Sequence, residues 1–266
     1  MKKAIYLFIL GTLCSAARAA TVTDDFNREN TGFASTVSEV AAMIGPNWKP
    51  IVTGTYPEYS STYRINNNAL GFGAATGWKP FLINTSAQTV NDGEGTGFAL
   101  SATFRDNSPA GLATMGLIFN YQEPGSFYML RQYFGGTTNY LQLLSFKNFI
   151  LTGGTALNAV NAYPYVRGEA YTFKITSDDP YIFNFSIADA SGAVVYSKMK
   201  ITLNPGQIKL KDGLGGFFCN NAAVVVDDFR LETPAGASND VVGMMPCDHA
   251  MVAALPARPV PGFGKH

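Results

Sequence analysis

Apolar and polar residues alternate with a period of two through the middle of this chain. Phe98, Leu100, Ala102 and Phe104 are each separated by a more polar or small residue, which is the pattern of a half-buried β-strand. Turn-forming sequences recur along the chain about every twelve residues, as at 106–109 and 123–125. This repeat of strand and turn predicts an antiparallel meander of the kind found in β-sandwiches and jelly rolls.

The same reading extends over most of the chain. The pattern predicts strands at 48–53, 61–65, 70–74, 80–90, 98–105, 115–121, 127–134, 140–146, 171–175, 181–187, 194–200, 215–219 and 224–231. Residues 147–166, which contain Gly153-Gly154 and Pro164, are expected to form a long irregular loop. Residues 37–44 fit a loop or one short helical turn. The predicted fold class is therefore all-β, a two-sheet antiparallel jelly roll.

Two similar acidic motifs bracket this β-rich region. Asp24-Asp25-Phe26 opens it and Asp227-Asp228-Phe229 closes it. Such bracketing suggests that the first and last strands of one sandwich lie side by side.

The N-terminus has the features of a secretory signal. Lys2 and Lys3 precede an apolar run at 4–13, and Ala17-Arg18-Ala19 fits a signal-peptidase site. The apolar run is shorter than the roughly 20 residues needed to span a bilayer. We therefore expect cleavage after Ala19, which would also remove Cys14. The protein is then exported to the periplasm or the extracellular space, and no other stretch approaches membrane-spanning length.

Charge indicates the class of partner, and composition divides the chain into a folded domain and a tail. Without residues 1–19 the chain keeps 16 basic and 19 acidic residues, which argues against a nucleic-acid partner. Residues 20–232 are long enough for one sandwich domain. Residues 233–266 are rich in alanine and proline, and their composition predicts a disordered tail.

Cysteine and histidine narrow the chemistry further. In an oxidising compartment, the remaining pair Cys219 and Cys247 predicts a disulfide; two unpaired thiols are the alternative. The only histidines, His249 and His266, lie in the tail. The predicted core therefore has no Ser-His or Cys-His nucleophile pair and no imidazole zinc site.

Several short motifs appear in an order that resembles the concanavalin A-like lectin/glucanase superfamily, whose members include laminin-G-like jelly rolls. They are 24–28 (DDFNR) with Trp48 downstream, 116–119 (GLIF), 127–131 (FYMLR), 141–143 (LQL), 215–217 (GGF) and 226–229 (VDDF). The resemblance covers roughly residues 21 to 232. It implies two curved antiparallel sheets, one of which often binds or cleaves glycans, although fold alone does not fix function.

The catalytic motifs of that superfamily are not evident in this sequence. The glucanase pattern Glu-x-Asp-x-x-Glu is absent, and Asp106, Glu123, Glu169 and Asp189 fall at predicted turns. Glycosidases need two carboxylates flanking the scissile bond. The lyase branch would place a histidine on the sheet, and none is present there. The sequence therefore favours a non-catalytic protein over an enzyme and predicts no catalytic residue.

Strand alternation predicts a binding face instead. If Leu117, Phe119, Tyr128, Leu130, Leu141 and Leu143 point into the core, neighbouring polar residues point outward. Those candidates are Asn120, Arg131, Tyr133, Tyr140 and Gln142. Tyrosine rings can stack on sugars, with amide and guanidinium donors between them. The alternative is an ordinary solvated face with cross-strand aromatic pairs.

The acidic motifs also suggest calcium, which takes six to eight oxygen ligands. Asp25 and Asp228 would supply two if the terminal strands pair. Alternatively, these aspartates cap strands or accept backbone hydrogen bonds at the sheet edge.

Taken together, the sequence favours an exported, non-catalytic domain that binds a polysaccharide or other glycan. A divergent polysaccharide lyase or glycoside hydrolase and a structural or adhesive surface protein are the alternatives. The glycan and the oligomeric state are not specified by the sequence.

Overall fold

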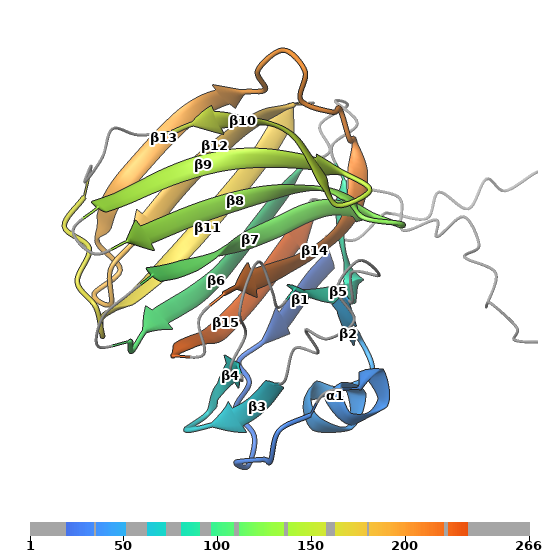
Figure 1. Ribbon diagram of the computed structural model, residues 1–266, viewed down its shortest axis with the longest axis vertical. Coiled ribbons are helices and arrows are strands. Elements are labelled where there is room, and N and C mark those ends of the chain that lie inside the picture. Colours follow the sequence, from blue (N-terminus) through green and yellow to red (C-terminus); the bar gives the residue numbers. More distant parts are fainter. Residues whose placement is uncertain are drawn as a thin grey trace, which may run out of the picture.

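The chain folds as a two-layer β-sandwich in a computed structural model (Figure 1). The structure describes residues 20–34, 36–51, 63–72, 81–90, 97–108, 112–135, 138–157, 163–179, 181–220 and 223–233. About 68% of the described residues are in strands and about 4% in helix. No helix among them is long and apolar enough to cross a membrane. The predicted signal at 1–19 and the tail from 234 onward lie outside the described residues.

Two antiparallel sheets form the layers. Sheet A has the order β13 (Val194–Thr202), β12 (Ile182–Ala188), β11 (Ala170–Asp179), β6 (Phe98–Asp106), β15 (Val224–Thr233), β4 (Ala69–Phe72), β3 (Tyr63–Asn66), and β1 (Ala20–Asp24) also pairs with β15. Sheet B has the order β10 (Ile150–Ala156), β9 (Thr138–Lys147), β8 (Ser126–Gly135), β7 (Leu112–Gln122), β14 (Asp212–Cys219), β5 (Phe81–Val90), β2 (Trp48–Ile51). The all-β sandwich prediction is confirmed.

The first and last described strands are direct neighbours. In the β1–β15 pair, Ala20 lies opposite Thr233 and Asp24 lies opposite Phe229. The two acidic motifs are therefore brought together at one end of this pair, as the bracketing predicted.

The space between the sheets is filled by the residues that the period-two pattern assigned to the core. Phe98, Leu100, Ala102 and Phe104 of β6 are all buried. From sheet B, Phe119 meets Phe98 at a ring-centroid distance of 5.7 Å. Leu117, Tyr128, Leu130, Leu141 and Leu143 belong to the same cluster. The predicted phase of the alternation on β7, β8 and β9 is thus correct for these residues.

The opposite face of sheet B is also apolar over part of its area. A second buried cluster there includes Phe127 and Met129 of β8, Leu144 and Phe146 of β9, and Phe218 of β14. Farther along the same face of β8 and β9, the side chains become polar. This change from apolar to polar marks the boundary of the predicted binding face.

The predicted loop at 147–166 is partly wrong. Residues 150–156 form strand β10, which pairs with β9 through a register shift between Leu151 and Gly153. Asn148 and Phe149 both adopt positive φ, 51° and 63°, and make a tight hairpin turn of the kind that matches strand twist. A Cβ on Gly154 would lie 2.6 Å from a Leu144 methyl group. The glycines that suggested a loop instead allow close strand packing.

The single described helix, α1 (Val37–Ile44), occupies the end of the molecule near β2 and β3 (Figure 1). Thr36 and Glu39 form a capping box, in which the Thr36 hydroxyl accepts from the Glu39 amide and the Glu39 carboxylate accepts from the Thr36 amide. These reciprocal bonds satisfy backbone donors at the helix start. The helical alternative predicted for residues 37–44 is the one observed.

Candidate functional site

Four of the five predicted ligand-binding residues lie together on the outer face of sheet B. Arg131 lies opposite Gln142, and Tyr133 lies opposite Tyr140, on the adjacent strands β8 and β9. The tyrosine rings are stacked, with centroids 4.6 Å apart and an interplanar angle of 17°. We call these four residues the tyrosine platform. Both rings and the Gln142 side chain are half-buried, so each keeps part of its surface open.

Arg131 is the polar centre of the tyrosine platform. Its guanidinium donates to the Gln142 side-chain oxygen, and its Cζ lies 5.9 Å from the centroid of the Tyr140 ring. Gly116, opposite Arg131 on β7, places no side chain beside the guanidinium. Burial lowers the pKa of Arg131 from its ordinary value, although both tyrosines oppose that shift. Arg131 itself is buried, with 9% of its surface exposed, so the platform holds a largely desolvated cation between aromatic and amide surfaces.

The local chain also holds Tyr133 in place. Its ring leans along its own strand over Gly135, where a Cβ would lie 2.8 Å from a ring carbon. A side chain at 135 would displace the ring from this position. The glycine that ends β8 thus helps to set the stack between Tyr133 and Tyr140.

Asn120 does not belong to this group, and its predicted outward orientation is wrong. It is fully buried and has φ of 51° at a register shift in the β7–β8 pair. Its amide nitrogen Nδ2 donates to the Leu210 carbonyl at 2.8 Å, and its backbone N–H donates to the Thr89 hydroxyl at 2.9 Å. A β-bulge interrupts strict alternation, so the phase that is correct at Phe119 fails one residue later.

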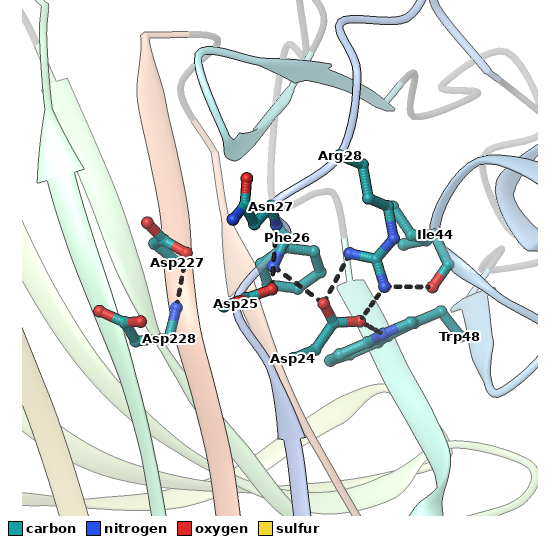
Figure 2. Close-up of polar contacts among 9 residues, drawn as sticks. All are labelled: Asp24, Asp25, Phe26, Asn27, Arg28, Ile44, Trp48, Asp227 and Asp228. Atoms are coloured by element: carbon teal, nitrogen blue, oxygen red, sulfur yellow. Dashed lines mark hydrogen bonds and ion pairs between the residues drawn. The ribbon is translucent and has the colours of Figure 1, made fainter.

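The acidic motifs form a different arrangement at the β1–β15 end (Figure 2). The Asp24 carboxylate accepts two hydrogen bonds from Arg28, at 2.6 and 2.9 Å, and one from Trp48 Nε1 at 2.8 Å. It also accepts from the Phe26 backbone at 2.9 Å. Asp24 is therefore a structural anchor for the chain entering the sandwich. Trp48 is buried, as expected for a core residue.

Asp25, Asp227 and Asp228 are less enclosed. Asp25 accepts from the Asn27 backbone at 3.1 Å, and Asp227 accepts from the Asp228 backbone at 2.8 Å. Burial, followed by the nearby charges of Asp228, Asp25 and Asp24, raises the pKa of Asp227 to about 6 although its backbone hydrogen bond opposes the shift. Figure 2 shows Asp227 and Asp228 on the strand beside Asp25, away from the Asp24–Arg28 pair.

The fit to calcium is limited at this end. Within the described part of the chain, no group of three or more Asp, Glu, His or Cys side chains is placed to hold a metal ion. Calcium prefers six to eight oxygen ligands, so Asp25 and Asp228 would need backbone carbonyls and water to complete a shell. Calcium binding remains a prediction from the sequence.

Asp106 was expected at a solvated turn but is buried. Its carboxylate lies 3.1 Å from the Arg167 guanidinium and 3.2 Å from the Tyr165 hydroxyl. It also accepts from the Ser108 amide at 2.9 Å. This carboxylate is thus held in an ion pair that joins the end of β6 to the segment before β11.

The predicted disulfide stays untested. Cys219 ends β14 and is fully buried in the main core. Its predicted partner Cys247 lies outside the described residues.

Sequence reasoning missed a hollow on the outer face of sheet A. It has a volume of about 220 Å³ and is lined by polar side chains from β3, β6 and β15, including Asn66, Arg105 and Asp227. These residues are separated by large intervals in the sequence. The only signal available was that Thr103, Arg105 and Asp227 alternate with core residues on two strands that become neighbours.

Comparison with known proteins supports the fold. No protein-family model and no curated protein matches the chain. A protein of unknown function from Shewanella oneidensis MR-1 is similar in structure, with a TM-score of 0.51 and 12% identity over 84% of this chain and 90% of that one.

Two carbohydrate-binding modules are also similar in structure. The CBM2 module of the evolved Dit of Lactobacillus casei BL23 phage J-1 has a TM-score of 0.49 and 12% identity, over 82% of this chain and 96% of that one. The CBM66 module from Bacillus subtilis has a TM-score of 0.44 and 12% identity, over 71% of this chain and 93% of that one. At such identities and TM-scores, a ligand of this chain must be argued from its own side chains.

Proposed function

We propose that this chain is an exported, non-catalytic carbohydrate-binding protein of the concanavalin A-like class, and that it binds a glycan on the tyrosine platform. The observation that carries the proposal is the stacked Tyr133–Tyr140 pair beside Arg131 and Gln142 on one open face. Aromatic rings offer apolar faces to sugar C–H groups, while guanidinium and amide groups bind sugar hydroxyls.

Several features favour binding over catalysis. The platform itself contains no carboxylate, whereas glycosidases use a pair of them at the scissile bond. The buried carboxylate of Asp106 is held by Arg167, and that of Asp24 is held by Arg28 and Trp48. Both carboxylates are thus engaged by structural partners within the sandwich.

Export and calcium complete the proposal. Export rests on the N-terminal Lys2-Lys3, the apolar run at 4–13 and the Ala17-Arg18-Ala19 site. The calcium part rests on Asp25, which directly follows β1, and on Asp228 of β15, the strand that pairs with β1.

A glycan array probed with the full chain tests this function. Every glycan that binds is then incubated with the protein and assayed for new reducing ends and for unsaturated products. Binding without turnover supports the proposal. Turnover would instead identify a divergent hydrolase or lyase, and absence of binding on the whole array would favour a structural or adhesive protein.

A further inference from the structure

The hollow on sheet A is built by a contrast between small and long side chains. Its floor is formed by Ala69 of β4, Val225 of β15, Thr103 of β6 and Ala170 of β11, all on strands that pair side by side. The pairing register places Arg105 between Val225 and Ala170 in one row, and places Thr103 opposite Asp227 in a second row. The short side chains of Ala69, Thr103, Ala170 and Val225 leave a depression, and the longer Arg105 side chain rises beside it from the same face.

The rim of the hollow is polar and of mixed charge. It carries the amides of Asn66, Asn67 and Asn107, the guanidinium of Arg105 and the carboxylate of Asp227. One Asp227 oxygen already accepts the Asp228 amide, which fixes the carboxylate and leaves its second oxygen available as an acceptor. Among the described residues, Arg105 has no ion-pair partner, and its side chain is exposed.

This set of groups selects for a particular ligand chemistry. An anionic ligand bound at Arg105 would be repelled by the Asp227 carboxylate. A cationic ligand bound at Asp227 would be repelled by the Arg105 guanidinium. A hydroxyl group both donates and accepts, so adjacent hydroxyls satisfy the carboxylate, the guanidinium and the amides together. The volume of about 220 Å³ lies below the roughly 300–1,000 Å³ of sites for drug-sized ligands, which favours a single ring.

We infer that this hollow is a second carbohydrate-binding site, and that it takes one uncharged sugar ring through its hydroxyl groups. The inference rests on the proposed carbohydrate-binding function and extends it. No aromatic side chain lines the hollow, so this site relies on hydrogen bonds where the tyrosine platform relies on stacking. Because the two sites lie on the outer faces of opposite sheets, one chain is able to join two glycan strands.

Two-dimensional NMR of the assigned full chain tests the inference directly. The probes are methyl glycosides of neutral hexoses, each titrated to tens of millimolar, with the matching uronic acids as charged counterparts. We expect a neutral glycoside to shift the backbone amides around 66–69, 103–107 and 225–227. Shifts around 131–142 report the tyrosine platform separately.

Variants assign the binding to the hollow. Arg105→Ala should weaken binding about tenfold or more, the range expected when a hydrogen bond to a charged group is lost. Ala170→Phe should abolish the shifts by filling the floor. Lys174→Ala, an exposed change farther along β11, is the matched control and should leave them unchanged, as should Tyr133→Ala.

Other outcomes separate this inference from the proposed function. Shifts confined to 131–142 would overturn the second site while supporting the platform. Shifts at the hollow that survive both Arg105→Ala and Ala170→Phe would also overturn it, and tighter binding of the uronic acids would overturn its neutral specificity. Shifts confined to the hollow would support this site and contradict the tyrosine platform. No shift with any glycoside would reject both.

Discussion

Tyr133 and Tyr140 stack face to face across the β8–β9 pair, with ring centroids 4.6 Å apart. A cross-strand aromatic pair is an ordinary way to stabilise a sheet face, so the stack alone does not define a binding site. This pair differs from an ordinary one because Arg131 is adjacent to it. The Arg131 guanidinium lies beside Tyr140 and donates to Gln142.

The first prediction therefore concerns Tyr133. Replacing Tyr133 with Ala should lower affinity for a bound glycan about tenfold, on the order of 1 kcal/mol, because a stacking surface is lost. Calorimetric titration measures the affinity. The Tm should stay nearly unchanged, since the ring is half-exposed and outside both apolar clusters. Tyr133→Phe keeps the ring and is the control; a large fall in the Tm of Tyr133→Ala would show that the ring acts in the core.

The second prediction separates the two aspartates of the opening motif. Asp24→Ala should destabilise the fold by about 3 kcal/mol, because Arg28, Trp48 Nε1 and the Phe26 amide lose a shared acceptor. Denaturant unfolding measures the change. Asp25→Ala removes an exposed carboxylate one residue later and should alter stability by less than about 0.5 kcal/mol. Equal effects of the two changes would contradict the anchoring role of Asp24.

The third prediction follows from the raised pKa of Asp227, about 6 in the folded chain against an ordinary 3.8. The folded state binds this proton more tightly than the unfolded state does. The contribution of Asp227 to stability is therefore fully present below about pH 4 and is lost as the pH rises through about 6. Asp227→Asn should raise the Tm at pH 7.5 and flatten its dependence between these pH values.

Asp189 provides a contrast of opposite sign. Its pKa is lowered chiefly by a hydrogen bond from the Ser191 hydroxyl, and backbone bonds from Ser191 and Ala193 act in the same direction. Asp189→Asn should therefore remove stability that is present at neutral pH and absent in acid. For Asp227, the contrary outcome is that Asp227→Asn loses stability toward neutral pH more steeply than the unchanged protein does. That result would refute the raised pKa of Asp227.

The fourth prediction addresses calcium. With two side-chain carboxylates, Asp25 and Asp228, the affinity should fall in the weak range of about 10⁻⁴–10⁻³ M seen for some extracellular modules. The Tm should then rise at millimolar calcium and return after chelation. Asp228→Asn should abolish that rise, whereas Glu123→Gln, at an exposed ion pair with Lys49, should retain it. A Tm that is insensitive to 10 mM calcium excludes the site.

The fifth prediction concerns the cysteines. A disulfide between Cys219 and Cys247 would close a loop worth about 3 kcal/mol on the chain-entropy model. A non-reducing peptide digest of the exported protein should contain the linked pair. If both cysteines are alkylated when the protein is denatured without a reductant, the disulfide is contradicted.

The sequence by itself determined the architecture of this protein. Period-two alternation at Phe98–Phe104 identified a strand and its buried face, because successive side chains of a strand point to opposite sides. The same rule placed Tyr128 and Leu130 in the core and Arg131 and Tyr133 on the outer face. The paired acidic motifs correctly brought the first and last strands together.

Tertiary structure decided the features that depend on departures from regular alternation. The bulge at Asn120 turns a residue predicted to be exposed into a buried one with long-range hydrogen bonds to Thr89 and Leu210. Gly153 and Gly154 suggested a loop but lie in a strand. A larger side chain at these positions would meet Gln207 or Leu144 of β9, and this packing is not visible in the local sequence.

The hollow on sheet A shows the same limit most clearly. Asn66, Thr103, Ala170 and Asp227 come from four strands, and no local pattern relates them. Strand order and register place them on one surface, and the volume left there depends on which small residues the pairing aligns. Local periodicity tells which face a side chain occupies, whereas its neighbours on that face are set by long-range pairing.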